Sequence, residues 1–303
     1  MTKHQTAILK LLLASVLWGL SFSIARIALV SFTTSQLLFW RFLIAFLAAE
    51  LLLYIFNRKI FYESNSDIKI AKYSGFALGI CLILQIHGLN FTTATNSAFI
   101  TATYVVMIPF LAYIFYKQKI RFIDVALAAL ALTGMVLLLD ILTKSGFSLT
   151  DLNFGDLLTL ACSVAAGLQI MLIGKYSKTC VSPFRFNTYQ VFWSLISLLP
   201  YCIYEWVTKN SGLVPDVITG SAVLGVIALA LLVSVFAFYL QVSSQKHLST
   251  ATASMLCLLE APFSFIFAAI MLGEKVNGLQ AIGALVIIIS AFLSIRFEKP
   301  LEI

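Results

Sequence analysis

Two ionisable residues, Glu260 and Arg41, lie inside long apolar segments of this sequence. An ionisable side chain at mid-bilayer costs at least about 3 kcal/mol, so it needs a partner, a watery cavity or a function. Glu260 lies near the middle of the segment 249–272, and Pro262 leaves a carbonyl one turn earlier without its donor. This pattern predicts a proton or cation site at Glu260. The alternative is a buried acid that stays protonated or caps a neighbouring helix.

Arg41 lies within the segment 34–56, roughly 10 Å from its nearer end. That depth strains a side chain that must reach water, so we expect Arg41 to face protein. We hypothesise that Arg41 and Glu260 lie across one central cavity, where Arg41 holds an anionic group and Glu260 a cationic one. The alternative is a structural salt bridge.

Four aromatic residues are candidates for the walls of that cavity, because aromatic faces attract cations. They are Trp18, Trp40, Tyr104 and Trp193. Aromatic residues near the ends of spans also serve as interfacial anchors, which is the alternative for each of them.

Membrane-spanning helices must position these residues. The chain is 61% hydrophobic and 11% charged, against about 25% charged residues in soluble domains. Apolar stretches long enough for a hydrocarbon core of about 30 Å predict an all-α integral membrane protein with ten spans. The predicted spans are 7–30, 34–56, 70–89, 94–116, 122–142, 155–174, 184–204, 218–241, 249–272 and 278–295.

The net charge is +7, and the basic residues are distributed among the loops instead of forming one patch. This distribution argues against a nucleic-acid partner. If the first span begins in the cytoplasm, only Lys144, Lys209 and Lys275 lie outside, and the other loop Lys and Arg residues lie inside. This bias predicts a multi-pass protein of the inner (plasma) membrane with both termini cytoplasmic.

The two halves of the chain resemble each other at one offset of 153 positions. Phe39 and Trp40 then align with Phe192 and Trp193, and Pro109 aligns with Pro262. Repeats of five spans, an odd number, run through the membrane in opposite senses. We therefore predict two inverted five-helix repeats, 1–146 and 147–303. Chance similarity between sequences rich in Leu, Ala and Phe is the alternative.

Other chemistries lack their residues in this sequence. No phosphate-binding loop is present, so we expect no nucleotide cofactor. The histidines are scattered and no Cys/His cluster has ligand spacing, so we expect no metal. Glu260 has no second carboxylate at its depth, so we do not expect an enzyme. Gly75 and Gly79 have the spacing of a helix-packing face.

A set of short motifs spread over nearly the whole chain resembles the EamA-like family of the drug/metabolite transporter superfamily. The matching positions are Trp18-Gly19, Ser21-Phe22, 39–45, 95–101, 105–109, Gly155-Asp156, 259–262 and Gly273-Glu274. The resemblance implies ten helices in two inverted repeats around a central cavity, often serving export of amino acids or other metabolites. Two departures are Ala261, which separates Glu260 from Pro262, and Gln118 and Lys119, where the family has an acid.

The sequence therefore predicts a secondary transporter or facilitator of a small polar metabolite, an amino acid or related solute, working by alternating access. A flippase of lipid-linked or amphiphilic molecules and a drug efflux pump of the same fold are the alternatives. The expected partners are a small-molecule substrate and the bilayer. The sequence is compatible with a monomer and with a homodimer.

Overall fold

The computed structural model describes residues 1–63, 65–89, 91–92, 100–117, 119–139, 153–209, 212–272 and 277–298, and all regular structure within them is helical. The all-α prediction is thus confirmed. Seven helices in this part of the chain are long and apolar enough to cross a membrane. The matched positions 95–99, Gly273 and Glu274, and Gln118, lie outside the described residues.

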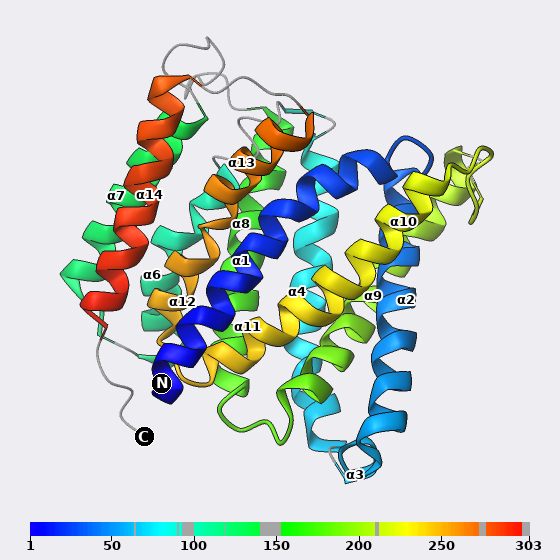
Figure 1. Cartoon of the computed structure of the whole chain (residues 1–303), viewed down its shortest axis with the longest axis horizontal. Helices are drawn as coiled ribbons and strands as arrows, with labels where there is room; N and C mark the ends of the chain where they lie inside the picture. The colour runs from blue at the N-terminus through cyan, green and yellow to red at the C-terminus, as the bar shows by residue number, and fades with distance from the viewer. Residues whose placement is uncertain are drawn as a thin grey trace.

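The helices form one bundle (Figure 1). In the first half they are α1 (Lys3–Ala28), α2 (Thr34–Phe56), α3 (Arg58–Glu63), α4 (Asn65–Leu89), α6 (Tyr104–Tyr116) and α7 (Phe122–Leu138). In the second half they are α8 (Phe154–Tyr176), α9 (Pro183–Lys209), α10 (Gly220–Ala228), the π-helix η2 (Leu229–Ala237), α11 (Phe238–Gln245), α12 (Thr250–Cys257), α13 (Glu260–Leu272) and α14 (Gly278–Arg296).

Capping boxes fix where several of these helices begin. The Thr33 side chain accepts a hydrogen bond from the Gln36 backbone, and the Gln36 side chain accepts one from the Thr33 backbone. Asn277 and Gln280 do the same for α14. Each box satisfies two of the backbone N–H groups that a helix start leaves without partners.

Two of the predicted spans are irregular near their middle. The helix from Gly220 to Gln245 changes to π geometry in η2, and the span 249–272 is interrupted after Cys257 and resumes at Glu260. Pro262 supplies no backbone donor to the turn before it, which accounts for the second interruption. Irregular backbone at membrane depth is tolerated where it is enclosed by protein or lines a cavity.

Glycines let helices of the two halves approach closely. A Cβ built on Gly79 of α4 would lie 1.7 Å from Ser197 Oγ of α9, and one on Gly75 would lie 2.6 Å from Gln190 O. On the other side of the bundle, a Cβ on Gly283 of α14 would lie 2.2 Å from Leu138 N of α7. The packing role of Gly75 and Gly79 is confirmed.

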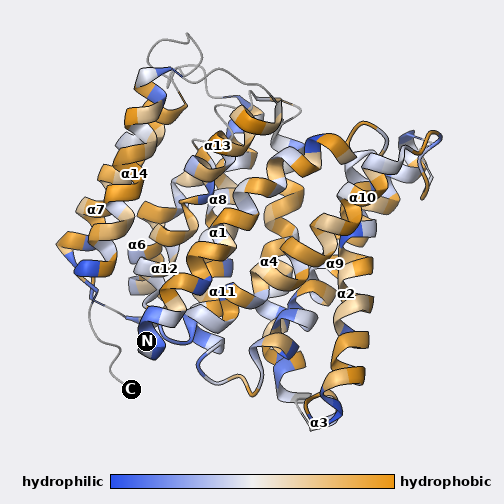
Figure 2. Ribbon diagram, viewed as in Figure 1, coloured by the Kyte–Doolittle hydropathy of each residue, from blue (hydrophilic) through white to orange (hydrophobic). Residues whose placement is uncertain are grey.

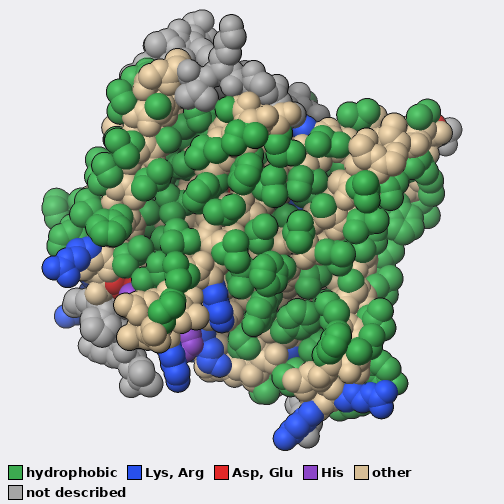
Figure 3. Space-filling view, viewed as in Figure 1, with side chains coloured by type: hydrophobic (Ala, Val, Ile, Leu, Met, Phe, Trp, Pro, Cys, Tyr) green, Lys and Arg blue, Asp and Glu red, His purple; other side chains and the backbone are tan. Residues whose placement is uncertain are grey.

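The outer surface of the bundle is apolar, as a lipid-facing surface must be. Hydrophobic residues cover the helices in Figure 2 and most of the face shown in Figure 3. Most Lys and Arg side chains visible on that face gather along its lower edge. The start of α1 and the end of α14 also lie at that end (Figure 1). The chain is a multi-pass membrane protein, and the side on which this end lies stays a prediction.

Candidate functional site

Arg41 projects from the first half of α2 toward the π-helix. Its Nε donates to Ser234 Oγ at 2.8 Å. Within the described residues, no carboxylate lies within ion-pair distance of Arg41, and its two terminal nitrogens have no hydrogen-bond partner. The four hydrogens on these two nitrogens of the Arg41 guanidinium are therefore available to an anionic group.

Two backbone carbonyls of the π-helix accept hydrogen bonds from α9, one of them on the serine that bonds Arg41. Asn187 Nδ2 of α9 donates to Ser234 O at 3.1 Å and to Val235 O at 2.9 Å. The widened turn of a π-helix is common at functional sites. Arg41, Ser234 and Asn187 thus form a polar cluster on three helices. The sequence analysis missed Ser234 and Asn187, although a buried Asn in an apolar segment is itself a signal.

Glu260 is the first residue of α13, directly after the interruption of its span. A carboxylate in the first turn of a helix interacts favourably with the helix dipole. Glu260 lies close enough to Tyr104, Cys81 and Cys257 to act on them electrostatically. The structure therefore brings together two of the predicted site residues, Glu260 and Tyr104, of which the latter begins α6.

Arg41 and Glu260 do not form an ion pair with each other, and neither forms one with another described residue. The salt-bridge alternative is thus absent from the described part of the chain. Helix α1 links their surroundings, because it packs against both η2 and α13. Gly19 permits the second contact, since a Cβ there would lie 2.6 Å from Phe263 Cβ. A cavity shared by the two charges stays a prediction.

Trp18 lies on this linking helix. Its ring packs 5.5 Å from that of Phe238, centroid to centroid, just beyond the π-helix. The indole Nε1 is buried and has no hydrogen-bond partner. A buried donor without a partner is costly, so this N–H is available to a solute.

Trp40 and Trp193 have partners within the protein. Trp40 Nε1 donates to Leu213 O at 2.9 Å, and Trp193 Nε1 donates to Ile68 O at 3.1 Å. Both hydrogen bonds hold an indole against the backbone of another segment of the protein. Their role as cavity walls stays a prediction with an alternative structural account.

Other buried polar groups were not singled out by the sequence analysis. Amide atoms of Gln169, Gln190 and Gln241 are buried and lack hydrogen-bond partners. Arg185 Nη1 forms an ion pair with Glu50 at 2.6 Å, and its Nη2 donates to Phe61 O at 3.1 Å. The three glutamines suit a polar solute, whereas the Glu50–Arg185 pair joins α2 to α9.

Among the described residues, no three His, Cys, Asp or Glu side chains lie together in a way that could hold a metal ion. The nearest approach of two thiols described is that of Cys81 Sγ and Cys162 Sγ, at 3.5 Å, and both cysteines are free.

Comparison with known proteins agrees with the motifs quoted above. The sequence model of the EamA-like transporter family matches residues 5–140 and 153–296. An uncharacterized transporter of Archaeoglobus fulgidus is 29% identical over 96% of this chain and 86% of its own length. The uncharacterized transporter YetK of Bacillus subtilis is 24% identical over 86% of this chain and 77% of its own length. A crystal structure with 16% sequence identity has a TM-score of 0.76 and covers 97% of both chains, which shows the shared fold.

Proposed function

Because the chain belongs to the EamA-like transporter family, we propose that it is a secondary transporter or facilitator of an amino acid or a related small polar solute. The observation that carries this proposal is a pair of opposite charges that form no ion pair with any described residue, Arg41 beside a π-helix and Glu260 at a helix interruption. Arg41 binds the carboxylate of the solute and Glu260 its ammonium group.

The pattern of contacts between helices supports two inverted repeats. If the halves are exchanged, α1 corresponds to α8, α2 to α9, α4 to the span containing η2, α6 to the span α12–α13, and α7 to α14. The contact of α1 with η2 then corresponds to that of α4 with α8, and the contact of α2 with η2 to that of α4 with α9. The pairs α2–α9 and α7–α14 correspond to themselves. A two-fold relation between two five-helix repeats, ten spans in all, produces this pattern.

The arrangement of two inverted repeats supports a mechanism of alternating access. Ser234 and Glu260 lie on the irregular helices, and the glycine-mediated contacts join helices of opposite repeats. In our proposal, the repeats rock against each other around the solute, so that it is exposed to one side of the membrane at a time.

The test is solute counterflow in proteoliposomes with a panel of amino acids, with and without a pH gradient. We expect Arg41→Gln and Glu260→Gln each to abolish counterflow while the purified yield and the elution volume stay those of the parent protein. Lys178→Gln is a matched control that removes a charge from an exposed position outside the site. Counterflow that survives both charge substitutions would disprove the proposed site.

A flippase of amphiphilic molecules is the second candidate, and one observation favours it. A groove of about 430 Å³ runs between α4 and α8, lined by apolar side chains such as Phe76, Ile80 and Leu168, with Lys72 also in its lining. An apolar groove with a cation suits an acyl chain with an anionic headgroup. Flipping of a fluorescent phospholipid by the reconstituted protein, in the absence of amino-acid counterflow, would favour this candidate.

A further inference from the structure

A small basic pocket lies where α1 begins and α11 ends. Its volume is about 240 Å³, and its lining includes Lys3, Thr6 and Lys10 of α1, with Ser243 of α11 and His247 just beyond it. Every ionisable side chain in this lining is basic, and the hydroxyl groups of Thr6 and Ser243 are its other polar side-chain groups. Figure 3 shows Lys or Arg side chains beside a His side chain at the corresponding lower edge.

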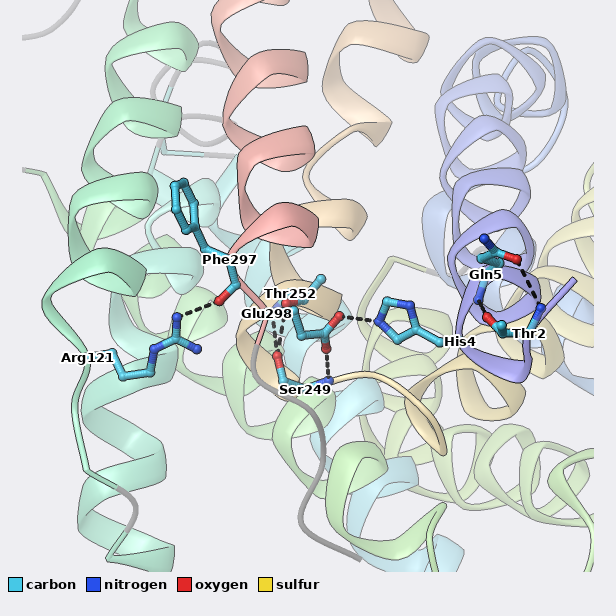
Figure 4. A network of polar contacts seen from close by, with 8 residues as sticks. All are labelled: Thr2, His4, Gln5, Arg121, Ser249, Thr252, Phe297 and Glu298. Carbon is cyan, nitrogen blue, oxygen red and sulfur yellow. Dashed lines mark hydrogen bonds and ion pairs between the residues drawn. The ribbon is translucent and has the colours of Figure 1, made fainter.

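The acidic residue next to this pocket is already engaged. Glu298 accepts a hydrogen bond from Ser249 N at 2.5 Å with one oxygen, and its other oxygen lies 2.7 Å from His4 Nε2 (Figure 4). Its side chain is only 4% exposed. Both carboxylate oxygens are therefore occupied at the end of α14, and they do not serve the lysines of the pocket.

The lysines keep donors available. Lys10 Nζ donates to Ser243 Oγ at 2.8 Å, which leaves two of its three hydrogens. Neither Lys3 nor Lys10 forms an ion pair within the described residues. Lys246, the next basic residue, points its Nζ at Cys180 O, 3.3 Å away.

The electrostatics of His247 report the same excess of positive charge. Burial lowers the pKa of its imidazole, and the nearby Lys3, Lys246, Lys10 and His4 lower it further. Like charges disfavour a protonated histidine, so an anion placed among these groups would raise that pKa again.

We propose that this pocket binds the phosphate of an anionic phospholipid. The acyl chains have a surface to follow, because Leu9 and Leu13 continue along α1 from the pocket and are both exposed. Basic groups at a membrane surface attract anionic lipids electrostatically. The headgroup joins α1 to α11, two helices from opposite halves of the chain, and this site is independent of the solute site around Arg41.

The test uses the full chain, purified in a neutral detergent, with dioleoylphosphatidylglycerol and dioleoylphosphatidylcholine as probes. Native mass spectrometry measures how much of each lipid is retained. We expect the double variant Lys3→Gln/Lys10→Gln to weaken retention of phosphatidylglycerol about 30-fold, equivalent to about 2 kcal/mol. Lys59→Gln/Lys178→Gln removes the same charge from exposed positions outside the pocket and should leave retention unchanged.

The wild-type protein alone also tests the proposal, whether or not the double variant folds. Phosphatidylglycerol should be retained at least tenfold more strongly than phosphatidylcholine, and it should raise the pKa of His247 measured by NMR, with His247→Gln for assignment. Equal retention of the two lipids, or equal weakening by both double variants, would overturn it. Inorganic phosphate that displaces phosphatidylglycerol at equimolar concentration would assign the pocket to a free anion and overturn the lipid assignment.

Discussion

The contact between α7 and α14 offers a sharp prediction, because two glycines of the same helix have opposite surroundings. A Cβ on Gly283 would lie 2.2 Å from Leu138 N and 2.6 Å from Gly134 O, whereas a Cβ on Gly278 would meet nothing within 4 Å. Both contacts at Gly283 are with backbone, which cannot rotate away. Gly283→Ala must therefore push α7 and α14 apart.

Two opposing effects set how far Gly283→Ala changes the free energy of unfolding. Alanine is favoured over glycine in a helix by about 0.5–1 kcal/mol, and overpacking costs about 1–3 kcal/mol. We expect Gly283→Ala to lower the free energy of unfolding by about 2 kcal/mol because its obstruction is entirely backbone. Gly278→Ala should leave that free energy unchanged or raise it by about 0.5 kcal/mol.

The assay is thermal unfolding in detergent, followed with a dye that fluoresces when it reacts with thiols. All five cysteines are buried and free, so they react as the bundle opens. The reasoning is refuted if Gly283→Ala melts at the temperature of Gly278→Ala.

Three further predictions concern other parts of the molecule. Glu50→Gln should destabilise the protein by about 3 kcal/mol, since it leaves the Arg185 cation buried without its partner, and the thiol-dye melting curve measures this. Trp40→Phe should cost about 1 kcal/mol of stability and leave counterflow intact, whereas Trp18→Phe should raise the half-saturating solute concentration at unchanged stability. Burial raises the pKa of the Cys180 thiol from 9.0 to about 11, so a variant with Cys180 as its only cysteine should resist maleimide at pH 7.5 and react above pH 10. Because unfolded chains release this proton near pH 9, the stability that Cys180 contributes should fall as the pH rises above 9.

Sequence patterns predicted the apolar helices well because the bilayer demands long apolar runs. The predicted span 34–56 coincides with α2, and 122–142 agrees with the start of α7 at Phe122. The helix expected at 70–89 begins earlier, at Asn65, and its Asp67 is buried and accepts hydrogen bonds from Val181 N and Ser182 N just before α9.

The site could be predicted only in part. Arg41 and Glu260 were recognisable because charges are costly in an apolar segment. The π-helix, the Arg41–Ser234 hydrogen bond and the Asn187 contacts depend on which faces of α2, α9 and η2 meet, and no local pattern encodes that. The ion pair of Glu50 with Arg185 was missed for the same reason, since 135 positions separate the two residues.

The most direct test of the account pairs a change in the protein with a change in the solute. Counterflow is measured for a transported amino acid and for its methyl ester, with the parent protein and with Arg41→Gln. If Arg41 binds the solute carboxylate, Arg41→Gln should cost the amino acid about tenfold or more in half-saturating concentration and leave that of the ester unchanged. Equal losses for the acid and the ester would contradict the account.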